Sequence, residues 1–256
     1  MKRSKKLLCL VMVFVFILGI NSFVYAADTV DRQVSKSIDK AVAFLNAVQN
    51  EDGGFGTREG RPSSWGMTSW VILALNAAGE DVASAKWQKS GLSPISFLKH
   101  NQESLTDTTD IARILLTLSS ANENPVYNGI NLVERLKSFQ DNQGHFGQAA
   151  KNEESWINAH IWTVLALNSA GCQIPDQEKA RKWLLDSQNE DGGFSWFRGG
   201  LSDADDTGIA LQSLIILGED PANSVAIKKA FTYLKKCQTE DGGINCGNEW
   251  MGSDSN

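Results

Sequence analysis

A short turn sequence recurs along the chain at a nearly constant spacing, and it limits the fold more than any other feature. Each copy begins with a glutamine, has a glycine four residues later, and in most copies then has an aromatic residue. The copies read QNEDGGFG from Gln49, QDNQGHFG from Gln140, QNEDGGFSW from Gln188 and QTEDGGIN from Gln238, with a degenerate copy at Gln102. Their starts lie about 40 to 50 residues apart, the period of arrays built from helix pairs. The sequence therefore predicts repeated helical hairpins.

Two kinds of helix alternate between these turns. After a polar lead-in over residues 28–37, which we expect to be unstructured, one kind carries apolar residues on a single face, as from Ile38 to Val48. The other kind is apolar around nearly its whole circumference and must be buried. We expect amphipathic helices at 38–48, at 94–100 and around Leu132, Ala180 and Ile227, and buried helices at 65–78, 107–120, 158–171 and 205–218. An inner set of buried helices wrapped by an outer set satisfies this order, and as a ring it hides every apolar face only when it closes.

The first 26 residues have the pattern of a secretory signal peptide. Four basic residues precede an apolar core from Leu7 to Ile20, and Val24-Tyr25-Ala26 offers small residues for cleavage before Ala27. The core is short for a membrane span, although an uncleaved anchor is the alternative. We therefore expect a secreted or cell-surface protein with no stable membrane span after cleavage, and a mature domain over residues 27–256.

The charge and cysteine content of the mature chain restrict its partners. Without Lys2, Arg3, Lys5 and Lys6, 20 of the 24 Lys and Arg remain against 30 Asp and Glu, and no basic stripe is left. Nucleic acid is therefore not an expected partner. Cys237 and Cys246 flank the last glycine turn and could form a disulfide in an exported protein, with free thiols as the alternative. Since neither a paired CxxC nor a Cys/His cluster occurs, we expect no metal and no cofactor.

The turns, the Ser/Thr-rich caps and the apolar helices together resemble the repeat of protein prenyltransferase β subunits and squalene cyclases. The resemblance covers nearly all of residues 27–256 and implies an all-α fold, an α/α toroid of about six hairpins, in which the Gln amide binds backbone near a neighbouring helix end. The chain carries about four and a half such hairpins. Either the 256 residues are an incomplete version of a longer chain, which we favour, or a partner closes the ring.

The sequence Asp203-Ala204-Asp205-Asp206-Thr207 is the sharpest candidate for chemistry. It is similar to the Asp-x-Asp-Asp-Thr motif of class II terpene and squalene–hopene cyclases, whose middle Asp protonates an alkene or epoxide, and Asp205 falls on that position. Clustered carboxylates raise the pKa of one member, so Asp203 and Asp206 would keep Asp205 neutral. The alternative is helix capping: the other buried helices begin at Ser63-Ser64, Thr106-Asp107 and Glu154-Ser155, and the helix dipole stabilises the charged form of an Asp there.

His160 and a set of aromatic residues complete the candidate site. Aligning Gly171 with Gly218 places His160 opposite Thr207, within reach of Asp205 or Asp206, although a solvent-facing or core histidine is the alternative. Asp110 and Arg113, three residues apart, are expected to form an ion pair. By resemblance, aromatic residues near the starts of the inner helices line a ligand cavity, or else they pack between helices. They are Trp65, Trp70, Trp156, Trp162, Trp196 and Phe197.

Missing motifs decide between the functions that the resemblance allows. The Asp-x-Cys zinc pair of protein prenyltransferases does not occur, nor does the Gly-Cys-Gly-Glu-Gln thioester segment of complement-type toroids. Two hypotheses remain. In the first, the chain is a secreted ligand-binding or cell-surface module that takes an apolar or polycyclic small molecule such as an isoprenoid or a corrinoid. In the second, it is a protonation-initiated isoprenoid cyclase with Asp205 as the acid. Because known squalene cyclases act on substrates made inside the cell, we favour the first.

Overall fold

The computed structural model describes residues 32–100, 105–148 and 156–245, and the chain divides into two compact units, 1–49 and 50–256. In the first unit, residues 32–48 are helical, so the helix begins within the segment that we expected to be unstructured. Val42 is buried there, whereas Ile38 is 42% exposed. The expected signal peptide lies outside the described residues. None of the described helices combines the length and apolar character needed to cross a membrane.

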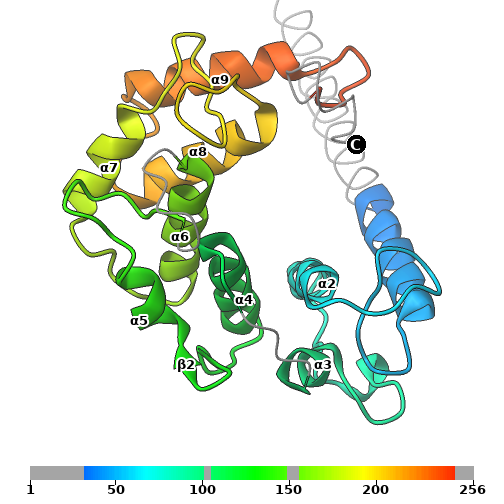
Figure 1. The fold of residues 1–256 in the computed structure, drawn as a ribbon. Helices are drawn as coiled ribbons and strands as arrows, with labels where there is room; N and C mark the ends of the chain where they lie inside the picture. The colour runs from blue at the N-terminus through cyan, green and yellow to red at the C-terminus, as the bar shows by residue number, and fades with distance from the viewer. Residues whose placement is uncertain (1–31, 101–104, 149–155, 246–256) are drawn as a thin grey trace, which may run out of the picture. The chain divides into compact units, whose positions relative to one another are not determined.

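The second unit contains the buried helices that the sequence predicts. Each of these four helices packs against the next in chain order (Figure 1). Polar links join neighbours within the layer: Asn76 Nδ2 donates to Ser120 Oγ at 2.8 Å, and Ser213 Oγ donates to the Ile161 carbonyl at 3.1 Å. The layer consists of α2 (Trp65–Ala77), α4 (Thr108–Ser120), α6 (Ile157–Ser169) and α8 (Ala204–Ile216).

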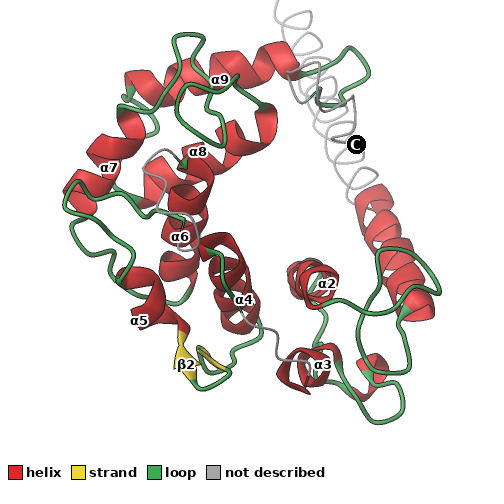
Figure 2. Ribbon diagram, in the orientation of Figure 1, coloured by secondary structure: helices red, strands yellow, loops and turns green. Residues whose placement is uncertain are grey.

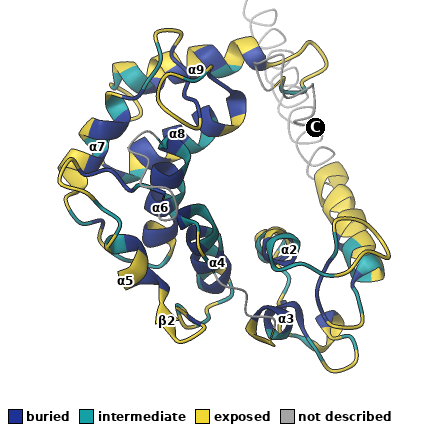
Figure 3. Ribbon diagram, in the orientation of Figure 1, coloured by how far each residue is buried: buried dark blue, intermediate teal, exposed yellow. Residues whose placement is uncertain are grey.

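The amphipathic helices of this unit pack on the buried layer. Helix α3 (Pro94–His100) contacts α2, α5 (Leu132–Lys137) contacts α4, and α7 (Gln177–Leu185) and α9 (Val225–Cys237) contact α8. Their exposed residues lie on one side and their buried residues face the layer (Figure 3). In α9, Ile227 and Ala230 are buried as the periodicity predicts, but Phe231 is 51% exposed and Tyr233 takes its place in the core. The alternation of amphipathic and buried helices is confirmed.

Two small elements were not expected from the sequence. A 3-10 helix, η1, spans Ala85–Trp87, and an antiparallel hairpin pairs β1 (Val126–Tyr127) with β2 (Ile130–Asn131) before α5 (Figure 2). Each strand has two residues, too few to show an alternating pattern in the sequence. The Asn131 side chain then caps α5 by accepting from the N–H groups of Val133 and Glu134.

The copies of the recurring turn that start at Gln49, Gln140, Gln188 and Gln238 share the same two backbone hydrogen bonds. In the third, the Asn189 N–H donates to the Gly193 carbonyl and the Gly192 N–H donates to the Asn189 carbonyl, both at 3.0 Å. Gln188 Nε2 donates at 2.8 Å to the Gly192 carbonyl and to that of Ala226 in the first turn of α9. The Gln amide thus ties the turn to the next amphipathic helix, as the resemblance implies.

The turn also attaches to the buried helix that follows it. The aromatic residues of three turns, Phe55, Phe146 and Phe194, are buried, and each donates its backbone N–H to a side chain of that helix. The acceptors are Thr68 Oγ1 at 3.0 Å, His160 Nδ1 at 3.2 Å and Thr207 Oγ1 at 2.8 Å. His160 and Thr207 therefore occupy equivalent positions, which the sequence alignment predicted. Each accepts the backbone N–H of the phenylalanine in its turn.

Candidate functional site

Three aspartates stand at the start of α8 in different environments. Asp203 is the N-cap, and its carboxylate accepts from the Asp206 N–H at 2.7 Å. Asp203 and Asp206 are buried, with 5% and 8% of their surface exposed, whereas Asp205 is exposed. Capping explains Asp203, as it explains Ser64 at the start of α2, where the hydroxyl accepts from the Met67 N–H. It does not explain why Asp206 is also buried.

Burial governs the protonation of the two inner carboxyls. Burial, and after it the neighbouring charge of Asp203, raise the pKa of Asp206 to about 7. A hydrogen bond from Asn158 Nδ2 to Asp206 Oδ1, 3.0 Å long, acts in the opposite direction by stabilising the carboxylate. Burial also raises the pKa of Asp203, and the bonds from Asp206 lower it. The pair thus has a carboxylic acid that holds a proton near neutral pH, and Asp206 is the member whose pKa is strongly raised.

Asn158 joins this carboxylate group to an aromatic group formed by the segments that precede α6 and α8. Its backbone N–H donates to the Trp196 carbonyl at 2.9 Å, and Trp156 forms an isolated antiparallel bridge with Phe197. The Trp156 and Trp196 rings make an edge contact with centroids 5.3 Å apart, and Trp196 lies 6.2 Å from Phe197. Trp196 is 51% exposed and Phe197 is 38% exposed. Three of the predicted aromatic residues therefore meet at the end of the layer that carries the aspartates.

The other three predicted aromatic residues gather around Arg113. The guanidinium of Arg113 on α4 lies 5.4 Å from the Trp65 ring and 5.2 Å from the Trp70 ring, both on α2. Trp70 also makes an edge contact with Trp162 of α6, with centroids 5.5 Å apart. The predicted ion pair is present, with Arg113 Nη1 3.6 Å from Asp110 Oδ1. Trp70 remains 41% exposed, so these rings are not core residues.

The aspartates of α8 and the aromatic residues around Arg113 belong to one face of the helical layer. Asn158 and Trp162 are four residues apart on α6, one turn of the same side of that helix, and both are partly exposed. Asn158 contacts the Asp206 carboxylate of α8, and Trp162 contacts the Trp70 indole of α2. We call this surface the polar–aromatic face; it comprises Trp65, Trp70, Asp110, Arg113, Asn158, Trp162, Asp205 and Asp206.

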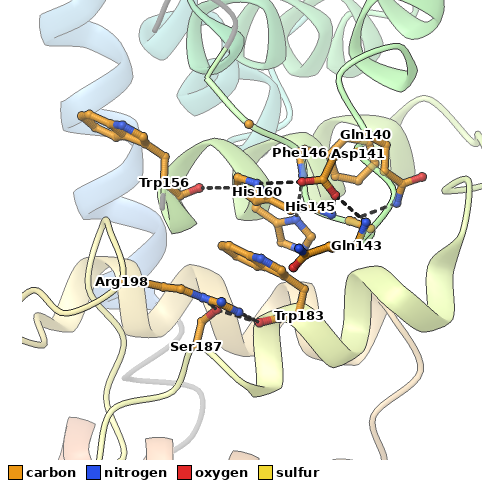
Figure 4. A network of polar contacts seen from close by, with 12 residues as sticks. Gln140, Asp141, Gln143, His145, Phe146, Trp156, His160, Trp183, Ser187 and Arg198 are labelled. Carbon is orange, nitrogen blue, oxygen red and sulfur yellow. Dashed lines mark hydrogen bonds and ion pairs between the residues drawn. The ribbon is translucent and has the colours of Figure 1, made fainter. Parts of the chain in front are cut away.

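His160 lies away from this face, within a buried network (Figure 4). It is fully buried, and its ring lies 5.8 Å from that of His145 and 4.9 Å from that of Trp183. No contact between His160 and Asp205 or Asp206 occurs in the described part of the chain, and its burial corresponds to the core histidine that we gave as the alternative. The reason is the Phe146 N–H, which holds the imidazole toward the turn.

The rest of the network is a stack of three side chains. His145 stacks on Trp183 with centroids 4.0 Å apart, and the Arg198 guanidinium lies 4.2 Å from the Trp183 ring. Arg198 also donates to Ser187 Oγ at 2.8 Å and to the Trp183 carbonyl at 2.9 Å. Burial lowers the pKa of His145, and it lowers that of His160 to about 3. Both imidazoles are therefore neutral at physiological pH and serve packing.

Sequence reasoning missed Asn158 and His145 and assigned Arg113 only an ion pair. A signal for Asn158 exists in its spacing of four residues from Trp162, but the partner on α8 depends on helix packing. The capping pair Glu154-Ser155 lies outside the described residues, and among the others Asp107 occupies the N-cap position of α4 without a side-chain cap bond. Within the described ranges, no three His, Cys, Asp or Glu side chains are grouped so as to bind a metal. Cys172 is a free thiol, whereas the predicted pairing of Cys237 involves Cys246, which lies outside the described residues.

Comparison with known proteins places this geometry in context. The profile of the prenyltransferase alpha-alpha toroid domain matches residues 6–109 and 111–251. No curated protein sequence matches the chain. Among solved structures, the chain is similar to a protein from Actinoplanes, with 17% identity, a TM-score of 0.59 and coverage of 81% of this chain and 67% of that one.

Two terpene synthases are also similar in fold. Type II terpene cyclase MstE from Scytonema, in complex with merosterolic acid A, has 16% identity and a TM-score of 0.60 over 83% of this chain and 66% of that one. The ent-copalyl diphosphate synthase from Streptomyces platensis has 20% identity and a TM-score of 0.51 over 75% of this chain. This chain spans 37% of the latter, so the likeness is to part of the larger protein. At these low identities, the structural similarity shows a shared fold alone.

Proposed function

The chain belongs to the prenyltransferase α/α toroid domain family, and on that basis we propose that it is a ligand-binding module that takes an apolar or polycyclic small molecule on its polar–aromatic face. The observation that carries the proposal is the contact of Trp70 with Trp162 beside Arg113, which brings side chains of α2, α4 and α6 together. An indole that is 41% exposed at Trp70, in contact with the partly exposed Trp162, indicates a surface that has a partner. Indole faces supply flat contact area at small cost in conformational entropy.

The ligands of similar solved structures decide which ligands to test first. The MstE structures contain merosterolic acid A and geranylgeranyl dihydroxybenzoate, so an isoprenoid is the first ligand to test, with a corrinoid as the second. The signal-like pattern of residues 1–26 supports export, so we propose that the protein captures its ligand outside the cell or at its surface.

A thermal-shift titration of the purified mature chain with geranylgeraniol and, separately, with cobalamin tests the proposal. A binder raises the melting temperature progressively as its concentration increases beyond Kd, because it stabilises the folded state by mass action. Trp70→Leu should abolish the shift, whereas Phe231→Leu, a change at an exposed aromatic residue of α9, should leave it intact. An equal shift in both variants would show that the ligand binds elsewhere.

A second candidate function is a protonation-initiated cyclase, which the carboxyl group with a pKa near 7 favours. In such a reaction the acid O–H bond breaks, the proton bonds to an alkene carbon and a carbocation forms, which indole faces stabilise. In this chain Asp205 is the exposed member that would meet substrate, while Asp203 and Asp206 would hold and supply the proton.

The cyclase function predicts a product that can be isolated. Incubation with geranylgeranyl diphosphate or squalene should yield cyclic isomers of unchanged mass in the wild type and none in Asp205→Asn. Asp220→Asn, which changes a carboxylate on the loop after α8, is the matched control. Product formation by Asp205→Asn at the wild-type rate would remove Asp205 from the mechanism, and no product from either substrate would leave the binding function alone.

A further inference from the structure

We propose that the ligand of the polar–aromatic face is an anionic amphiphile whose carboxylate, sulfonate or phosphate group is bound by Arg113 while its apolar body lies on Trp70 and Trp162. This inference rests on the proposed function and adds the charge of the ligand and the residue that reads it.

Arg113 is held in place by its surroundings rather than by a strong ion pair. Two indoles of α2 lie within 5.4 Å and 5.2 Å of its guanidinium carbon. Asp110 lies one turn earlier on the same helix, and the separation of 3.6 Å between its Oδ1 and Arg113 Nη1 is longer than a hydrogen bond. Stacking between rings fixes the plane of the guanidinium, so little entropy is lost when it binds a ligand.

The donors of Arg113 are largely unused. A guanidinium has five N–H donors arranged as a planar fork, which matches two oxygens of a carboxylate or phosphate. In the part of the chain that the structure describes, no acceptor lies at hydrogen-bond distance from these donors, and a quarter of the side-chain surface is exposed. By contrast, Arg198 donates to Ser187 and to a backbone carbonyl and so has a clear structural task. Arg113 therefore retains donors for an anion beside the indoles of the polar–aromatic face.

The groups around Arg113 define the rest of the ligand. Trp162 touches Trp70 on the side of α6, so an apolar surface continues from the guanidinium across α4. Farther along α6, Asn158 is hydrogen-bonded to the buried Asp206. A negative head group is attracted to Arg113 and repelled by the aspartates at the start of α8, which sets the direction of the ligand: head group at Arg113, apolar body toward α6.

Two fluorescent probes that differ only in charge test this inference. The probe 1-anilinonaphthalene-8-sulfonate carries a sulfonate, and N-phenyl-1-naphthylamine has the same rings without it. We expect the wild type to bind the sulfonate at least tenfold more tightly, and Arg113→Gln to remove a factor of roughly 10 to 100 for the sulfonate only. Arg135→Gln is the matched control, because Arg135 lies 4.8 Å from a single ring, Phe139, outside the polar–aromatic face.

The outcomes separate this inference from the proposed function. Selective loss of sulfonate binding in Arg113→Gln, with binding of the uncharged probe unchanged, supports the anion site. Equal affinities for both probes in the wild type, or equal losses of both in Arg113→Gln, would overturn it while leaving a ligand-binding face in place. If neither probe binds, or if both bind Trp70→Leu as well as they bind the wild type, the proposed function fails and this inference fails with it. Circular dichroism of each variant checks folding.

Discussion

At the scale of single residues, the neighbours Asp205 and Asp206 show how strongly position on a helix decides chemistry. Adjacent residues point about 100° apart around an α-helix, so one can face solvent while the next faces a neighbouring helix. Asp205 is exposed, and Asp206 is turned toward Asp203 and the Asn158 amide of α6. The buried position raises the pKa of Asp206 to about 7 from its ordinary value of 3.8.

Replacing Asp206 by Asn should therefore stabilise the protein at high pH. The folded state holds the Asp206 proton more tightly than the unfolded state, so the wild type loses stability as the pH rises from about 4 to about 7. The increase in the free energy of unfolding caused by Asp206→Asn should be larger at pH 8 than at pH 5 by roughly 1 to 3 kcal/mol. Urea denaturation at both pH values measures this, with Asp205→Asn as the control. Equal effects at the two pH values would show that Asp206 is not protonated in the fold.

His160 is a second residue whose role comes from its position. It accepts the Phe146 N–H where Thr68 and Thr207 accept the equivalent N–H in their hairpins. His160→Thr retains an acceptor there and His160→Val, of nearly the same shape, does not. We expect the Val variant to be less stable than the Thr variant by about 1 to 3 kcal/mol, because a buried N–H is left unpaired. Urea denaturation at pH 7.5 measures the difference, and equal stabilities would mean that the bond contributes nothing.

The same residue makes the fold sensitive to acid. Burial keeps the pKa of His160 at about 3, below its ordinary value of 6.5, so the unfolded state takes up the proton first. The stability contributed by the neutral imidazole is therefore complete above pH 6.5 and is lost as the pH falls toward 3. His160→Thr should lose less stability than the wild type between pH 7 and pH 4.5 in urea denaturation. His145, whose pKa burial also lowers, keeps part of the acid sensitivity in both proteins.

At the scale of elements, the hairpin turn depends on glycine where it meets the next amphipathic helix. Gly192 has a φ of 91°, and a Cβ atom there would lie 2.7 Å from the Lys229 carbonyl oxygen of α9. A side chain would therefore strain the backbone and push the turn away from α9. Gln188, which ties the same turn to the Ala226 carbonyl, would lose its partner if α9 moved.

Two glycine-to-alanine changes should consequently have opposite effects. Gly192→Ala should lower the free energy of unfolding by more than about 1 kcal/mol, because its backbone conformation and its space both exclude a Cβ. Gly208→Ala lies within α8, with no atom inside 4 Å of the added carbon, and should raise stability by about 0.5 to 1 kcal/mol through helix propensity. Thermal and urea denaturation of both variants test this; destabilisation by Gly208→Ala would reveal a packing constraint on α8.

At the scale of the whole molecule, residues 50–256 form an array in which each buried helix contacts its neighbours in sequence. In such an array, stability is close to a sum over hairpins and the interfaces between them. Damage to one hairpin should then spread to the adjacent hairpin more than to distant ones.

Hydrogen exchange of core variants tests this arrangement. Leu75 of α2 and Leu214 of α8 are both fully buried, and truncation of either to Ala should cost about 2 to 5 kcal/mol locally. Leu75→Ala should speed amide exchange in α2 and α3 more than in α8 and α9, and Leu214→Ala should do the reverse. A uniform increase across both regions in either variant would instead indicate a single cooperative unit.

Local sequence patterns were enough to predict the hairpin period, the alternation of amphipathic and buried helices and the equivalence of His160 with Thr207. These features depend on local patterns: the Gln–Gly–aromatic spacing, apolar periodicity and polar residues at helix starts. Only the tertiary structure decided which aspartate is buried, that His160 faces the Phe146 turn, and that Arg113 lies beside indoles of α2 near Trp162 of α6. Those outcomes depend on the rotation of each helix about its axis, and packing between residues far apart in the sequence sets that rotation.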